Sequence, residues 1–122
     1  MISKNDILQI IEENFFQELA QSVEDSISNL ESEEFESIFE QLVDYAELDT
    51  IDEVVIDNIE QEEDEAGVTI EGIMDVRVSL NGFVYWDGEY NYIEDGEYIL
   101  GFAFNFHAEG TEYSDFDMEH IY

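Results

Sequence analysis

The 122-residue chain has no cysteine and no proline, and its only basic residues are Lys4 and Arg77. The absence of cysteine excludes disulfides, zinc–thiolate sites and thiol chemistry. Direct binding of nucleic acid is not expected, because nucleic-acid-binding proteins hold the phosphate backbone with many lysines and arginines. An anionic membrane surface would repel such a chain. Of the possible macromolecular partners, a protein is therefore the one we expect.

Long apolar segments are also missing from the sequence. No run approaches the roughly 18 apolar residues that a membrane-spanning helix needs. The chain does not open with a basic segment followed by an apolar one, so we do not expect a signal peptide. The predicted location is therefore the cytoplasm, and no membrane partner is expected.

Acidic side chains dominate what is present. The 34 aspartates and glutamates give a formal net charge of -32, whereas a magnitude of about 2 to 8 is enough for solubility. Apolar residues make up 44% of the chain and include nine phenylalanines and seven tyrosines, too many for a disordered acidic tail. We therefore expect a folded domain. Its surplus charge destabilises the compact state by self-repulsion, so the charge needs a functional explanation.

Three explanations could account for the surplus of negative charge. An acidic surface suits a halophile, but fourteen isoleucines and seven asparagines do not suit that interpretation. A cation buffer needs carboxylates clustered in a rigid loop. A protein that competes for a nucleic-acid-binding site needs negative charge spread over an ordered surface. We favour this third explanation.

The apolar spacing changes character near residue 50. Residues 1–49 show helical spacing, and residues 50–122 alternate apolar and polar side chains as strands do. All seven glycines fall from Gly67 onward, as expected for helices followed by hairpins. We predict a single domain, residues 1–122, with an α+β fold. Two or three N-terminal helices pack on a C-terminal antiparallel sheet of about five strands.

The first amphipathic segment is predicted to start a helix at Ser3, a residue type that caps helices well. Its apolar residues occupy two faces that are rotated from each other. Either one long helix wraps around the core, or the helix breaks near Gln21–Ser22. The sequence leaves both possibilities open.

A second helix is predicted from about Glu33 to Glu47, with Ser32 as its cap. Its apolar residues fall on one side. Its acids fall on the other side: Glu33, Glu36, Glu40, Asp44 and Glu47. Like charges at this spacing cost a few tenths of a kcal/mol per pair, so helix stability does not explain the acidic stripe. We interpret it as a functional face.

Turn signals divide the second half into strands. A first strand is predicted over 54–61, and the acid-rich run Glu60–Glu65 is predicted to be a hairpin loop. Asn81–Gly82 and Asp95–Gly96 match preferred two-residue hairpin turns. Gly110 marks a last turn, and Gly72 is a candidate bulge.

Catalytic, cofactor and metal sites are not predicted. His107 and His120 are the only histidines, and no nucleophile beside a base singles itself out. The segment that begins at Asp87 starts like a calcium-binding loop, but Tyr92 stands where the loop needs glycine and Tyr98 where it needs glutamate. A calcium-dependent structural protein therefore remains only a third possibility, which a calcium titration would test.

The residues predicted to bind a partner are the helical stripe, the run after residue 61 and the acids between residues 87 and 97. They are Glu33, Glu36, Glu40, Asp44, Glu47, Glu62, Glu63, Asp64, Glu65, Asp87, Glu89, Glu94, Asp95 and Glu97. Duplex DNA offers one negative charge per roughly 1.7 Å of axis to the lysines and arginines of its binding proteins. Rows of carboxylates offer those cations a comparable field, which predicts a basic, nucleic-acid-binding protein as partner.

Four aromatic residues lie within the second acidic region: Tyr85, Trp86, Tyr90 and Tyr92. Such residues are more often buried in a core or on a sheet face. If they are exposed, they would anchor a protein interface within an acidic rim.

In size, charge and lack of a catalytic motif, the whole chain resembles the DNA-mimic inhibitors of phages and mobile elements. The resemblance is one of composition and carries no residue motif. It implies a non-enzymatic inhibitor that blocks a protein such as a CRISPR nuclease, a restriction enzyme or a repair glycosylase, in the host cytoplasm if a phage encodes it. The alternative is an immunity protein or antitoxin that neutralises a basic toxin nuclease.

Overall fold

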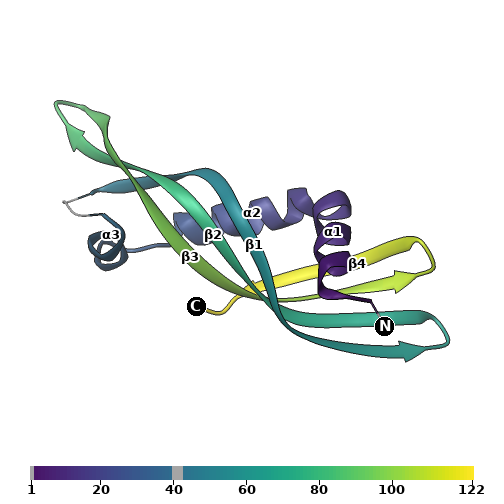
Figure 1. The fold of residues 1–122 in the computed structure, drawn as a ribbon. Coiled ribbons are helices and arrows are strands. Elements are labelled where there is room, and N and C mark those ends of the chain that lie inside the picture. Colours follow the sequence, from purple (N-terminus) through teal and green to yellow (C-terminus); the bar gives the residue numbers. More distant parts are fainter. Residues whose placement is uncertain (1, 40–42) are drawn as a thin grey trace.

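Helices precede long antiparallel strands in the computed structural model, which describes residues 2–39 and 43–122 (Figure 1). The helices are α1 (Lys4–Asn14), α2 (Phe16–Ser28) and α3 (Ser32–Ile38). The strands are β1 (Tyr45–Asp64), β2 (Gly67–Trp86), β3 (Glu89–Glu109) and β4 (Glu112–His120). The α+β class with N-terminal helices is confirmed. Among the described residues, no helix has both the length and the apolar character needed to span a bilayer.

The strands form one antiparallel sheet in the order β1-β2-β3-β4. The sheet has four strands where about five were expected, because its first three strands are unusually long, with 20, 20 and 21 residues. At about 3.3 Å per residue, such a strand extends over roughly 65 Å. The sheet twists along this length, and the β2–β3 turn lies at the opposite end from the β1–β2 and β3–β4 turns (Figure 1).

Two of the predicted hairpin turns are wrong. Gly82 and Gly96 lie inside β2 and β3, where they pair with Glu94 and Leu80. Their lack of a side chain serves packing instead. A Cβ on Gly82 would lie 2.8 Å from Phe39 Cε1, and a Cβ on Gly96 would lie 2.9 Å from the same atom. Both glycines therefore make room for Phe39, the residue after α3.

The turn between β2 and β3 is formed by Asp87–Gly88, the segment that began like a calcium loop. Both residues have positive φ, 54° for Asp87 and 85° for Gly88, as the favoured two-residue hairpin turn requires. The Asn91 side chain braces this turn by donating to the carbonyl oxygens of Trp86 and Glu89, at 3.2 Å each. The predicted turn at Gly110 is confirmed, with φ 62°.

The predicted strand boundaries also need correction. β1 begins at Tyr45, before the expected change at residue 50, and it continues to Asp64. The run Glu60–Glu65 is therefore mostly strand, and only its last residue belongs to the turn. The signal was weak because few β1 side chains are buried, Ala46 and Ile56 among them. One of three register shifts between β1 and β2 lies beside Gly72, where a bulge was predicted, although its extra residue belongs to β1.

The predicted helix over 33–47 is wrong as a single element. α3 ends at Ile38, and residues from Tyr45 onward belong to β1. Cross-strand pairing decides the outcome: Ala46 pairs with Gly82 and Leu48 with Leu80. The cap is also one residue earlier than predicted, because Glu31 N–H donates to the Glu34 carboxylate at 2.9 Å.

The first helical segment is neither one long helix nor broken near Gln21–Ser22, the two possibilities that the sequence left open; it breaks at Phe15. The cap at Ser3 is confirmed, because its hydroxyl accepts a hydrogen bond from Asp6 N–H at 3.2 Å. Phe15 is buried and packs against two sheet aromatics, with ring centroids 5.6 Å from Phe106 and 4.8 Å from Phe116. This packing accounts for the change of direction between α1 and α2.

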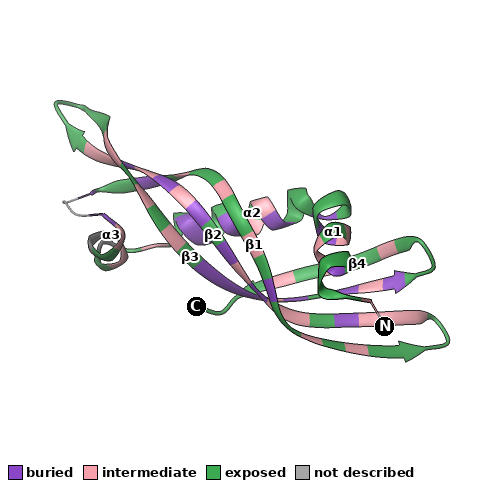
Figure 2. Ribbon diagram, in the orientation of Figure 1, coloured by how far each residue is buried: buried purple, intermediate pink, exposed green. Residues whose placement is uncertain are grey.

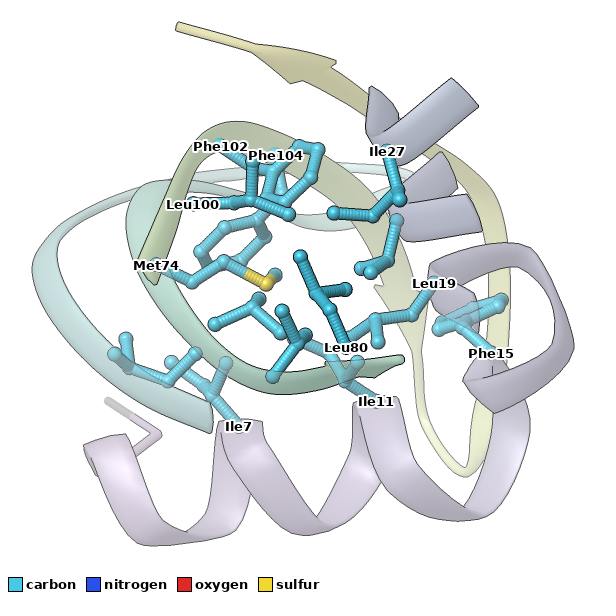
Figure 3. Close-up of a cluster of buried hydrophobic side chains, with 14 of the residues drawn as sticks. Ile7, Ile11, Phe15, Leu19, Ile27, Met74, Leu80, Leu100, Phe102 and Phe104 are labelled. Carbon is cyan, nitrogen blue, oxygen red and sulfur yellow. The ribbon is translucent and has the colours of Figure 1, made fainter. Parts of the chain in front are cut away.

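The core lies between the helices and one face of the sheet (Figure 3). The helices contribute residues one turn apart, such as Ile7 and Ile11 from α1 and Leu19 and Val23 from α2. The sheet contributes alternate residues of β2 and β3: Ile70, Met74, Val76, Val78, Leu80, Leu100, Phe102, Phe104 and Phe106. We call this the helix-covered face. Figure 2 shows the resulting alternation of buried and exposed positions along the strands.

Candidate protein-binding surface

The opposite face of the sheet is covered by none of the described helices (Figure 1). We call it the helix-free face. Its residues alternate with the buried ones, so the strand register decides which acids it presents. The acids that the register places on it include Glu47, Glu53, Glu60, Glu62, Glu71, Asp75, Asp95, Glu97, Asp117 and Glu119. All four strands contribute to this set.

Four polar residues form one row across the helix-free face, towards the end that carries the β1–β2 turn. Glu60 pairs with Glu71, Glu71 pairs with Asn105, and Asn105 pairs with Asp117. All four are exposed. Like charges directly opposite each other destabilise a sheet, and no lysine or arginine stands in this row. We call it the acidic row.

An open groove of about 660 Å³ runs along the acidic row. Its lining includes the four residues of the row and three residues of the next row on the same face, Ile73, Ala103 and Glu119. Apolar residues and carboxylates therefore both line the groove. Such a groove suits a cationic side chain or segment better than a neutral one.

Arg77, a basic residue on the helix-free face, is paired with an acid of the same face. Arg77 forms an ion pair with Glu53, with 2.9 Å between Nη2 and Oε2. Because both side chains are about half exposed, the pair contributes little to stability. Next to it, the hydroxyl of Tyr122 donates to Asp75, and the tyrosine ring lies over Gly101. The C-terminal residue therefore covers part of this face.

Asp52 has a different environment from the acidic row. The hydroxyls of Ser79 and Thr50 donate to its two carboxylate oxygens at 2.6 and 2.7 Å. These two hydrogen bonds, the Ser79 bond first, hold the pKa of Asp52 below its usual value. Hydrogen bonds to the ionised form have this effect because they stabilise the charge.

The end of the β2–β3 hairpin carries a cluster of aromatic rings. Tyr45 and Tyr90 lie 5.3 Å apart between centroids, Tyr85 and Tyr90 lie 5.2 Å apart, and Phe83 and Tyr92 lie 6.0 Å apart. We call these five residues the tyrosine cluster. A register shift between Gly82 and Phe83 brings Tyr92 onto the same face as Phe83. Tyr85, Tyr90 and Tyr92 are exposed, as is Trp86 at the tip, so the more common outcome of burial in a core does not apply to these aromatics.

Carboxylates accept hydrogen bonds from two hydroxyls of the tyrosine cluster. The Tyr92 hydroxyl donates to Asp95 at 2.7 Å, and this hydrogen bond is the main cause that raises the pKa of Tyr92. The Tyr45 hydroxyl donates to Glu47 at 3.2 Å. Burial, followed by this hydrogen bond, raises the pKa of Tyr45. Both phenols therefore stay neutral at physiological pH, and both carboxylates stay oriented towards the rings.

The structure divides the predicted partner-binding acids among three places. Glu62, Glu63, Asp64 and Glu65 lie at the β1–β2 hairpin, and Asp44, Glu47, Asp87, Glu89, Glu94, Asp95 and Glu97 lie towards the β2–β3 hairpin. Glu33 and Glu36 lie within α3. Glu40 lies outside the described residues. The helical stripe is therefore not one surface.

Asp44 serves the fold as well as the surface. Its N–H donates to the carbonyl oxygen of Phe83, and its carboxylate accepts from Tyr85 N–H, both at 2.9 Å. These bonds attach the chain before β1 to the end of β2. Asp44 therefore positions the tyrosine cluster, a role that the helical prediction did not foresee.

The sequence prediction missed several acids of the helix-free face, including Glu60, Glu71 and Asp117. A usable signal was present for Glu71, which follows the buried Ile70 in an alternating strand. No local sequence pattern predicts the acidic row, because the row depends on which residues of the four strands pair with one another. Within the described part of the chain, no group of three or more acidic or histidine side chains is arranged to hold a metal ion.

Comparison with protein-family models, curated proteins and solved structures finds no match to this chain. Function must therefore be argued from the surface described above.

Proposed function

We propose that the protein is a DNA-mimic inhibitor, which occupies the nucleic-acid-binding site of a basic protein such as a CRISPR or restriction nuclease. The observation that carries the proposal is the helix-free face, where four strands present carboxylates side by side. The acidic row opposes the stability of the sheet, and the core needs none of its side chains. Binding to a cationic partner accounts for this arrangement.

The electrostatics of the face match such a partner. A strand presents one side chain to a given face about every 6.6 Å, and neighbouring strands lie about 4.8 Å apart. Acids on four adjacent strands thus form a two-dimensional array, in which apolar residues such as Ile73, Ile99 and Ala103 separate some of the carboxylates. Phosphate contacts provide much of the sequence-independent affinity of DNA-binding proteins. A carboxylate array can engage the same lysines and arginines.

The experiment starts by capturing the partner on the immobilised protein from a nuclease-treated bacterial lysate at low salt. The captured protein is then purified and titrated with a labelled DNA duplex and with this chain. We expect mutually exclusive binding, and an affinity for this chain that falls steeply with added salt. A ternary complex with the duplex, or a partner that does not bind nucleic acid, would overturn the proposal.

The same titration addresses the alternative of an immunity protein or antitoxin. That alternative shares the electrostatic argument but requires the captured protein to be a toxin nuclease. A toxin gene next to the gene for this chain would favour it, and a phage neighbourhood would favour the mimic.

A further inference from the structure

The tyrosine cluster and the acids around it suggest how the partner is recognised at one end of the sheet. Tyr85 and Tyr90 are a cross-strand pair, with 55% and 57% of their surfaces exposed. Their rings are held in a T-shaped arrangement, with an interplanar angle of 69°. Large aromatic side chains that are both exposed and mutually ordered are typical of protein-interface anchors.

Charge decides between the possible occupants of this end. Glu47 and Asp95 hold two of the tyrosine hydroxyls, and Asp87 and Glu89 are exposed at the adjacent turn. A second copy of a chain with net charge -32 would be repelled, and so would nucleic acid. A cationic segment is attracted both by the carboxylates and by the negative faces of the rings.

We propose that the tyrosine cluster is an arginine-binding site, at which an arginine of the partner stacks on Tyr85 and Tyr90 while nearby carboxylates pair with its charge. This inference rests on the proposal that the partner is basic, and it adds a specific contact. Arginine is favoured over lysine because a planar guanidinium stacks on an aromatic face and is weakly hydrated, whereas an ammonium group is a strongly hydrated point charge.

The test uses two peptides of equal length and charge, an arginine homopeptide and a lysine homopeptide. Each is titrated into the full chain by calorimetry, with the tyrosine ring signals followed by NMR. We expect the arginine peptide to bind about two- to fivefold more tightly, the range of one exposed cation–π contact. We also expect the ring signals of Tyr85 and Tyr90 to shift most.

Three variants test whether the preference for the arginine peptide depends on the rings of Tyr85 and Tyr90. Tyr85→Val with Tyr90→Val removes both rings but keeps residues that favour strands, and it should abolish the arginine preference while retaining salt-dependent binding. Tyr85→Phe with Tyr90→Phe keeps the rings and should keep the preference. Tyr122→Val is the matched control, because Tyr122 is also exposed, to 56%, but lies on another part of the sheet. This variant should still bind the arginine peptide more tightly than the lysine peptide.

Equal affinity for the two peptides would overturn the arginine site, as would a preference that survives the double valine substitution. Self-association in sedimentation that depends on the two tyrosines would identify a second copy as the occupant and would also overturn it. None of these outcomes decides whether the captured partner competes with a duplex. The arginine site and the proposed function can therefore fail separately.

Discussion

The two faces of the sheet are built from the same strands but follow opposite rules. Neighbouring residues of β3 show the contrast: Leu100 is completely buried on the helix-covered face, whereas Ile99 is 55% exposed on the helix-free face. In β2, the buried Ile70 is likewise followed by the exposed Glu71. The helix-covered face stabilises the fold by removing apolar surface from water. The helix-free face instead carries the acidic row, in which Glu60 and Glu71 stand directly opposite each other and destabilise the sheet. Adjacent residues of one strand thus belong to faces of opposite character, and we propose that the helix-free face binds the partner.

The largest expected effect on stability comes from comparing alanine substitutions of the neighbouring residues Leu100 and Ile99 in β3. Leu100→Ala should lower the free energy of unfolding by about 2–5 kcal/mol, because it leaves a cavity in the core. Ile99→Ala should cost less than about 1 kcal/mol, because half of its surface already faces water. Chemical denaturation of both variants is the measurement. Equal losses would mean that the helix-free face is buried against something in solution.

A smaller effect is expected within the acidic row. Glu71→Gln removes one of two carboxylates that stand directly opposite each other, so it should stabilise the protein by a few tenths of a kcal/mol. Glu97→Gln is the control, since Glu97 pairs with Ser79 and faces no carboxylate there. The gain from Glu71→Gln should shrink as NaCl screens the repulsion. Stabilisation by Glu97→Gln of the same size would point to net charge and not to the row.

The smallest effect concerns Asp52, whose pKa is lowered by the Ser79 and Thr50 hydroxyls. A lowered folded-state pKa adds stability above the unfolded pKa, about 3.9, and this stability is lost as pH falls through the folded value. Asp52→Asn should therefore show a shallower loss of stability below about pH 4. Asp57→Asn, in the same strand, controls for the removal of one charge. Parallel pH profiles for the parent and Asp52→Asn would contradict this account.

Much of the fold could be predicted from local sequence patterns. The alternation from Tyr98 to Phe106 correctly indicated a strand with one buried face, and Ser3 correctly marked the start of α1. The predictions failed where distant residues decide the outcome. Gly82 and Gly96 looked like turn residues, but they accommodate Phe39. The segment after Ile38 had helical spacing, yet its pairing with β2 makes it a strand from Tyr45 onward.

The candidate site was less predictable than the fold. Composition alone indicated an acidic surface, and the acids near the β2–β3 hairpin were among those named from the sequence. The acidic row could not be recognised, because Glu60, Glu71 and Asp117 lie far apart in the chain and meet only through the register of four strands. The acidic stripe predicted for one helix is divided between α3 and the region around the start of β1, because strand pairing decides the structure from Tyr45 onward.

The central claim is that the location of the acids on the helix-free face, and not net charge alone, drives partner binding. Two sets of reversals test it most directly: Glu60→Lys, Glu71→Lys and Asp117→Lys against Glu12→Lys, Glu18→Lys and Asp25→Lys. Both sets replace two glutamates and one aspartate, and the second set lies exposed on α1 and α2. The measurement is competition with a labelled duplex for the captured partner. We predict that the first set loses competition severely and the second keeps most of it; equal losses would contradict the account.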